Sequence, residues 1–178
     1  AESPGSLTYD MPDLSELSTA AKKHDCWLAV DNTWASGLIY KPLTLGADIS
    51  LLAATKYLGG HADVMMGAAV VNRRAWRALE RASIDFGQTV GADDAFLVLR
   101  GMRSLPLRMA QHARNALRVA QWLQGRAEVA RVLCPALPGD PSHALWQRDC
   151  TGANGLLTVE LADAFDSAHA ERLIDSLR

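Results

Sequence analysis

The sequence predicts an α/β protein with a central, mostly parallel sheet flanked by helices. Three short apolar runs, at residues 27–31, 49–55 and 64–71, show no alternation of polar and apolar side chains. Such runs suit strands that are covered on both faces, as in parallel sheets. A helical pattern precedes the first run and others follow the third run. Periodicity alone leaves buried helical segments open as an alternative for these runs.

The first helix is expected over residues 14–24, with serines near its start and basic side chains at its end. A turn-rich connection, residues 41–48, separates the first two apolar runs. Beyond Asn72 the pattern becomes helical, over residues 73–85 and again over 93–102, with an interruption around Gly101 and Pro106. A third helix carries an apolar stripe at steps of three and four residues. The stripe comprises Leu105, Met109, Ala113, Ala116, Ala120 and Leu123.

A second α/β unit is expected in the last third of the chain. Residues 129–143 read as a strand followed by a loop rich in proline and glycine, and residues 155–161 read as another strand. We therefore predict that residues 1–126 are part of a larger domain and that residues 127–178 start a smaller C-terminal α/β domain. Both ends look interrupted, so we expect an interior fragment of a longer protein.

Composition narrows the classes of function. The chain has 178 residues, of which 49% are apolar and 21% charged, with a formal net charge of −2. The charges are interspersed, which disfavours a nucleic-acid partner, and no apolar run reaches the ~18 residues of a membrane span. Cys26, Cys134 and Cys150 are odd in number and scattered, which fits reduced thiols in a cytoplasmic protein. The histidines lack paired zinc-ligand spacing, so no metal site is expected.

Asp31 and Lys56 follow two neighbouring apolar runs and are the first candidate site residues. In open α/β sheets, ligands bind beyond the carboxyl ends of the strands. The pair meets the needs of pyridoxal phosphate chemistry, in which a lysine amine bonds to the aldehyde and a carboxylate keeps the pyridine nitrogen protonated. Thr55 offers a hydroxyl to a phosphate group. Taken alone, the same residues also suit a solvated strand end and a turn.

Several linked blocks make the sequence recognisable. They are "ESPGS" at 2–6, "DNT" at 31–33, "ATKY" at 54–57, "LRGMRSLPLRM" at 99–109 and "CPALPG" at 134–139. In this order they resemble the pyridoxal-phosphate-dependent trans-sulfuration enzymes of cysteine and methionine metabolism. The resemblance implies the fold-type I architecture of pyridoxal-phosphate-dependent transferases. It also implies that Lys56 is the Schiff-base lysine, that Asp31 partners the pyridine nitrogen and that Thr55 binds the phosphate.

Two positions depart from the family pattern. Ala53 stands where most members have a phosphate-binding serine, and Ser6 stands where most have an asparagine near the cofactor ring. We keep both among the candidate cofactor-binding positions. Both departures, and the block "GQTVGADDAF" at 87–96, are similar to the bacterial β-lyase branch of the family.

The resemblance to this branch implies a carbon–sulfur lyase of trans-sulfuration and methionine biosynthesis. Such an enzyme β-eliminates L-cystathionine to homocysteine, pyruvate and ammonia, and a homotetramer is expected. Three relatives within the family remain alternatives, namely a cystathionine γ-synthase, a cystathionine γ-lyase and a methionine γ-lyase. A truncated, inactive homologue that serves as a binding partner is an alternative of another class.

Other residues carry weaker expectations. Met65 and Met66 are expected in the core, where methionine often fills gaps. Trp34 suits the crevice and the core equally. Arg100, Arg103 and Arg108 are expected to make ion pairs or subunit contacts rather than to bind substrate. Tyr57 is expected to pack, and His61 to support a loop.

Overall fold

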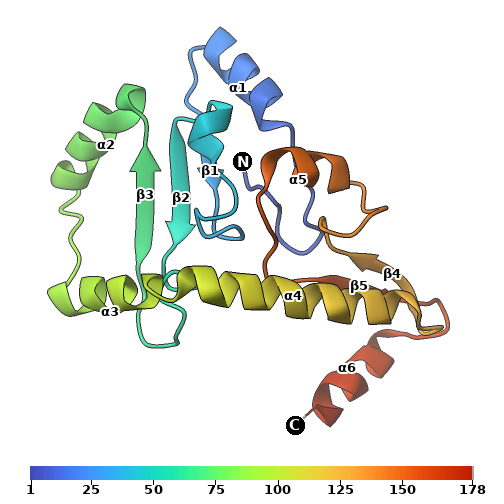
Figure 1. Ribbon diagram of the computed structural model, residues 1–178. Helices are drawn as coiled ribbons and strands as arrows, with labels where there is room; N and C mark the ends of the chain where they lie inside the picture. The colour runs from blue at the N-terminus through green and yellow to red at the C-terminus, as the bar shows by residue number, and fades with distance from the viewer. Residues whose placement is uncertain (178) are drawn as a thin grey trace.

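The computed structural model describes residues 1–177, in which the long helix α4 runs past two separate sheets (Figure 1). The first sheet contains three strands and the second contains two. The elements in chain order are α1 (Leu14–Lys23), β1 (Ala29–Asp31), the 3-10 turn η1 (Pro42–Leu45), β2 (Ile49–Ala53), β3 (Gly67–Val71), α2 (Arg73–Asp85), α3 (Ala92–Met102), α4 (Leu105–Gln124), β4 (Val129–Leu133), α5 (His143–Asp149), β5 (Thr158–Leu161) and α6 (Ser167–Ser176).

The first sheet combines a parallel and an antiparallel pair of strands. β1 and β2 are parallel, with Asp31 opposite Leu51, whereas β3 runs antiparallel to β2. The connection between β2 and β3 contains no helix, so it lacks the crossover that normally joins parallel strands. β3 is also more open than its sequence suggests, since Val70 is 50% exposed. The third apolar run is therefore an antiparallel strand that is not covered on both faces.

The helices after β3 follow the predicted pattern. α3 ends at Met102 and α4 begins at Leu105, with Pro106 in its first turn, where a missing N–H has no cost. Leu105, Met109, Ala116 and Ala120 of α4 are buried, and the two other residues of the predicted stripe pack partly buried beside them. The apolar stripe of this helix is confirmed.

The main apolar core joins residues that are far apart in the sequence. It includes Leu14 of α1, Val30 of β1, Met109 of α4 and Leu133 of β4. A smaller cluster, formed by Leu52, Ala54, Leu58, Val64 and Val98, lies around the segment that follows β2. This second cluster packs α3 against the turn that carries Lys56.

The C-terminal part forms its own sheet but is bound tightly to the rest. β4 and β5 pair antiparallel, with a bulge at Val129–Arg131. Contacts across the predicted boundary include Met11 N donating to Ser142 Oγ at 3.0 Å and Asn154 Nδ2 donating to Trp34 O at 3.1 Å. The division at residues 126 and 127 stays a prediction.

Asp48 is a buried polar centre that holds the start of β2 in place. Its carboxylate accepts hydrogen bonds from Leu28 N at 3.0 Å and from Asn72 Nδ2 at 2.8 Å, and it pairs with Arg74 at 3.1 Å. Burial alone raises the pKa of this carboxyl group, but these donors outweigh burial and lower the pKa below its usual value.

Among residues 1–177, none of the helices combines the length and the apolar character needed to cross a membrane.

Candidate active site

The parallel register of β1 and β2 brings the two candidate segments to the same edge of the sheet. Asp31 is the last residue of β1, and Lys56 follows the end of β2 by three positions. Parallel strands end at one edge, so both residues leave the sheet there, as the sequence predicts. Thr33 strengthens this edge, because its Oγ1 accepts a hydrogen bond from Ala53 N at 2.8 Å.

Asp31 is half-buried and only partly engaged. Its Oδ1 accepts a hydrogen bond from Thr33 N at 2.9 Å. Within residues 1–177, Oδ2 has no such partner and can still accept a hydrogen bond from a ligand. The backbone of Asp31 is fixed on its outer side, where a parallel bridge joins it to Glu2.

Ser6 lies just beyond this bridge and uses its side chain locally. Its backbone N and its Oγ both donate to the carboxylate of Glu2, at 3.0 and 2.7 Å. The first block of the resemblance therefore runs alongside β1, as a short extended segment that ends in a turn. Ser6 lines neither of the two cavities described below.

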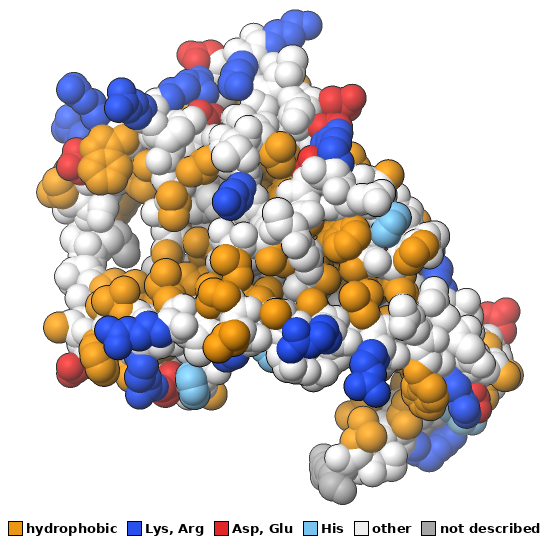
Figure 2. Space-filling view, in the orientation of Figure 1, with side chains coloured by type: hydrophobic (Ala, Val, Ile, Leu, Met, Phe, Trp, Pro, Cys, Tyr) orange, Lys and Arg blue, Asp and Glu red, His pale blue; other side chains and the backbone are white. Residues whose placement is uncertain are grey.

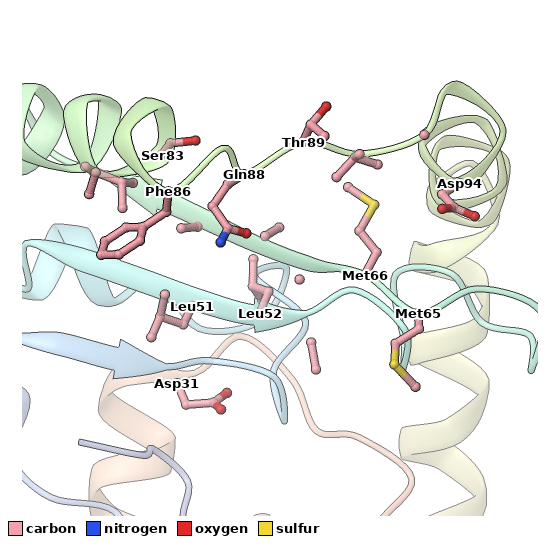
Figure 3. Close-up of a pocket in the computed structure, with 18 residues that line it drawn as sticks. Asp31, Leu51, Leu52, Met65, Met66, Ser83, Phe86, Gln88, Thr89 and Asp94 are labelled. Carbon is pink, nitrogen blue, oxygen red and sulfur yellow. The ribbon is translucent and has the colours of Figure 1, made fainter.

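Asp31 and Ala53 line one cavity of about 880 Å³, which we call the aspartate cavity. Figure 3 shows Leu51 and Leu52 of β2 on its sheet side and Phe86 and Gln88 on the opposite side. Most of its lining is apolar or small. Its other lining residues are Met65, Met66, Gly67, Ala68, Ala69, Leu79, Ala82, Ser83, Thr89, Val90, Gly91 and Asp94.

Lys56 stands at the start of a tight turn after β2. Lys56 N donates to Ala53 O at 3.0 Å, and Gly60 N donates to Lys56 O at 2.8 Å, which closes the turn. The Lys56 side chain is exposed, and within residues 1–177 it forms neither an ion pair nor a hydrogen bond. Its terminal nitrogen therefore has no competing partner among the described residues.

Thr55 and Lys56 line a second cavity, which we call the lysine cavity. Its lining includes four side chains that are or can become cationic, and none of its described lining residues is acidic. Such a lining attracts an anion. The full set is Thr55, Lys56, Tyr57, Gly60, His61, Ala62, Arg108, His112 and Leu156.

The hydroxyl of Thr55 already has backbone partners. Its Oγ1 donates to Met66 O at 3.2 Å and accepts from Met66 N at 2.8 Å. These bonds tie the lysine turn to the approach to β3. A hydroxyl group has only one proton to donate. To donate a hydrogen bond to a phosphate, Thr55 would therefore have to give up its hydrogen bond to Met66 O.

Tyr57 and His61 have the structural roles expected of them. Tyr57 meets His112 edge-on, with 5.8 Å between the ring centroids, and burial raises the pKa of its phenol. His61 Nδ1 lies 3.1 Å from Gly59 O and so supports the turn. Trp34, for which the crevice and the core were equally suited, is buried in the main core.

The structure thus groups the candidate residues in two sets. Asp31 and Ala53 share the aspartate cavity, and Thr55 and Lys56 share the lysine cavity. Arg108, which the sequence did not place among the site residues, lines the lysine cavity together with Lys56. Sequence reasoning assigned Arg108 to ion pairs or subunit contacts, because an arginine that binds backbone carbonyls leaves no spacing signal.

A carboxylate and a lysine that leave two parallel strands at one edge of the sheet fit the class of α/β enzymes that use pyridoxal phosphate. Residues 1–178 match the family described as Cys/Met metabolism PLP-dependent enzyme, and the chain belongs to this family. Pyridoxal phosphate is the cofactor of the family, and the fold is that of its fold-type I members.

Two curated relatives illustrate the similarity. A protein named cystathionine beta-lyase from Bordetella avium is 57% identical over 162 residues, which cover 90% of this chain and 41% of the relative. A cystathionine beta-lyase from Escherichia coli K12 is 42% identical over 177 residues, which cover 98% of this chain and 45% of the relative. The chain therefore spans less than half the length of these relatives.

Solved structures give the same family. A cystathionine gamma synthase from Xanthomonas oryzae pv. oryzae, in complex with cystathionine, superposes with a TM-score of 0.93 at 37% identity, covering 99% of this chain and 46% of the other. An apo methionine gamma lyase from Micromonospora echinospora superposes with a TM-score of 0.89 at 34% identity, covering 98% of this chain and 47% of the other.

The residues present fit pyridoxal phosphate in chemical type. Oδ2 of Asp31 can accept a hydrogen bond from a protonated ring nitrogen, and the Lys56 amine can bond to an aldehyde. The cationic lining beside Lys56 suits a phosphate group. These groups leave the sheet at one edge, which is where a ligand of an α/β sheet binds.

Proposed function

We propose that this chain provides the lysine-bearing part of a pyridoxal-phosphate-dependent carbon–sulfur lyase that acts on L-cystathionine by β-elimination. The observation that carries the proposal is the shared sheet edge of Asp31 and Lys56, in a chain 57% identical to a protein named cystathionine beta-lyase. The products would be homocysteine, pyruvate and ammonia.

Each candidate residue receives a role. Lys56 would hold the aldehyde carbon of the cofactor, and Asp31 would accept a hydrogen bond from the ring nitrogen and so keep that nitrogen protonated. Thr55 would donate to the phosphate. Ala53 would lie beside the cofactor without a hydroxyl to offer, and Ser6, which donates to Glu2 and lines neither cavity, stays a predicted neighbour of the cofactor ring. When bound, the cofactor supplies an electron sink for the negative charge that develops at the substrate Cα.

Lys56 is also the base that we assign to the reaction. Its amine, once free, would take the proton from the substrate Cα, and general bases of this kind contribute about 10²–10⁴-fold in rate. Loss of that proton and departure of the thiolate from Cβ release homocysteine. Hydrolysis of the remaining three-carbon fragment yields pyruvate and ammonia.

A γ-specific activity is the second candidate. Solved neighbours carry the names cystathionine gamma synthase and methionine gamma lyase, at TM-scores of 0.93 and 0.89. The products separate the two functions, since β-cleavage of cystathionine gives pyruvate and homocysteine and γ-cleavage gives 2-oxobutyrate and cysteine.

The test uses the complete polypeptide that the gene encodes, loaded with pyridoxal phosphate and supplied with cystathionine. We expect pyruvate and homocysteine, and we expect Lys56→Ala to abolish the visible absorption band of the lysine-bound cofactor and to lower turnover by at least about 10²-fold. Lys41→Ala, at an exposed lysine outside both cavities, is the matched control and should keep full activity.

Near-normal turnover of the Lys56→Ala protein would contradict the proposal. The release of 2-oxobutyrate instead of pyruvate would favour the γ-specific alternative. Cofactor binding or partner binding without any turnover would favour an inactive homologue.

A homo-oligomer, a tetramer by family resemblance, and a cytoplasmic location complete the proposal. Large apolar side chains are exposed on α3 and on the loop before it, including Phe86 at 79% and Phe96 at 62% exposure, and a partner subunit would cover them. Figure 2 shows apolar side chains gathered over α3 and α4 on this face. The three cysteines are free thiols, which suits a reducing compartment.

A further inference from the structure

The guanidinium of Arg108 connects the lysine turn to the junction between α3 and α4. Its Nη2 donates to Tyr57 O at 2.8 Å and to Gly101 O at 3.0 Å, and its Nε donates to Ser104 Oγ at 3.1 Å. The side chain is only partly exposed, so these bonds compete with little water. One cation thus binds the residue next to Lys56 and both sides of the helix junction.

Two glycines give the guanidinium and the turn their close contact. Gly60 has a φ of +74°, and a Cβ there would lie 2.5 Å from Arg108 Cζ. Gly101 lies in the last turn of α3, where a Cβ would collide with the carbonyl oxygens of Gly59 and Leu58. The turn is therefore held from two sides, by the guanidinium of Arg108 and by the backbone of α3 at Gly101.

The remaining supports of the turn act elsewhere. Thr55 is bound to Met66 ahead of the lysine, and His61 is bound to Gly59 after it. The carbonyl of Tyr57, one residue after Lys56, is held by Arg108. This carbonyl belongs to the Tyr57–Leu58 peptide, one peptide beyond the bond that joins Lys56 to Tyr57. Fixing it restrains the turn on the C-terminal side of Lys56, and so limits the directions in which the Lys56 side chain can leave the turn.

We propose that Arg108 is the positioning residue of the Lys56 turn, which aligns the amine toward the cofactor without touching the reacting atoms itself. This inference rests on the proposed function and adds a residue to its site. Lysine is a poor substitute, because an ammonium on a flexible stem lacks the planar fork that reaches two carbonyls and a hydroxyl at once.

The experiment compares Arg108→Ala and Arg108→Lys with Arg118→Ala in the complete polypeptide. Arg118 is an exposed arginine on the same helix and serves as the matched control. The first readout is amide hydrogen exchange over residues 56–61 in the cofactor-free protein. We expect exchange at Gly59 and Gly60 to rise about tenfold in Arg108→Ala, to rise less in Arg108→Lys and to stay unchanged in the control.

The second readout is the pH titration of the visible absorption band in the loaded protein. A merely structural arginine would leave its midpoint unchanged, whereas a positioning residue shifts it, with partial rescue by Arg108→Lys. Should Arg108→Ala fail to fold, the comparison of Arg108→Lys with the control decides the same question.

Exchange rates equal to those of the control would overturn the inference, as would raised exchange with an unchanged titration midpoint. The proposed function fails separately, if the unsubstituted protein forms no borohydride-reducible bond at Lys56. The exchange comparison needs no cofactor, so it would still show whether Arg108 holds the Lys56 turn.

Discussion

The two cavities of the candidate site have different linings, one mostly apolar and one with several cationic or titratable side chains. Asp31 faces a space lined mostly by apolar and small side chains. Lys56 faces a space lined by further cationic or titratable side chains. The first environment suits a heteroaromatic ring, and the second suits an anionic group.

Replacement of Asp31 by asparagine tests the first environment. Asp31→Asn keeps the size of the side chain but removes the charge, so we expect the affinity for pyridoxal phosphate to fall about tenfold or more, the typical effect of losing one charged hydrogen bond. Absorbance titration of the cofactor-free protein measures this affinity. Asp85→Asn, at an exposed pair with Arg81, is the control, and equal affinities in the two variants would remove Asp31 from the site.

For single residues, the sequence predicted which side chains belong to the candidate site better than it predicted how exposed each side chain is. Asp31, Thr55 and Lys56 were recognised because their types and order are characteristic, and the structure sets Asp31 and the Lys56 turn at a common edge. The expectation for Met65 was wrong, since this side chain is 91% exposed and lines the aspartate cavity. An apolar run does not reveal which of its residues precede the strand, and Met65 lies in the loop before β3.

Among the elements, α3 approaches the lysine turn so closely that a Cβ at Gly101 would meet the carbonyl oxygens of Gly59 and Leu58. Replacement of Gly101 by alanine should therefore separate the two segments, and we expect it to destabilise the protein by about 1–3 kcal/mol, the typical cost of overpacking. Gly125→Ala is the matched control, because its Cβ would meet only Trp122 O, at 3.6 Å. Urea unfolding of both variants measures the difference, and equal midpoints would refute the close contact.

The elements were predictable where an apolar pattern repeats over many residues. The α4 stripe identified its buried face correctly, because six apolar positions repeat at helical spacing. The direction of β3 could not be read from the sequence, since a parallel and an antiparallel strand share the same apolar composition. The helix α5, which has no buried residue, also went unpredicted, because a short helix after a loop rich in proline has no apolar period to detect.

Across the whole molecule, Asp13 joins α1, near the start of the chain, to α5 in the C-terminal part. It caps α1 by accepting from Ser15 N and Glu16 N, and it pairs with Arg148 of α5 at 2.7 Å. The hydrogen bond from Arg148, with the backbone bonds of the cap, lowers the pKa of Asp13 to about 2. The folded protein therefore binds this proton more weakly than the unfolded chain does.

The sign of the resulting pH dependence follows directly. A carboxyl group with a lowered pKa stabilises the fold above its unfolded value of 3.8, and this stabilisation disappears as the pH falls toward 2. Asp13→Asn retains a good helix cap but loses the ion pair, so we expect it to be less stable than the unsubstituted protein at pH 7 and nearly equal to it near pH 2. Urea unfolding at both pH values measures this, and a stability difference that is the same at both would contradict it.

The bonds between Met11 and Ser142 and between Trp34 and Asn154 also determine when folding can finish during translation. A ribosome adds about 5–20 residues per second, so the partners of the N-terminal segment emerge roughly 7–26 s after it. During that interval the inner faces of α1 and β1 lack their C-terminal cover. A newly made chain of this protein is therefore expected to stay incompletely folded until the segment from β4 to Asn154 has left the ribosomal tunnel.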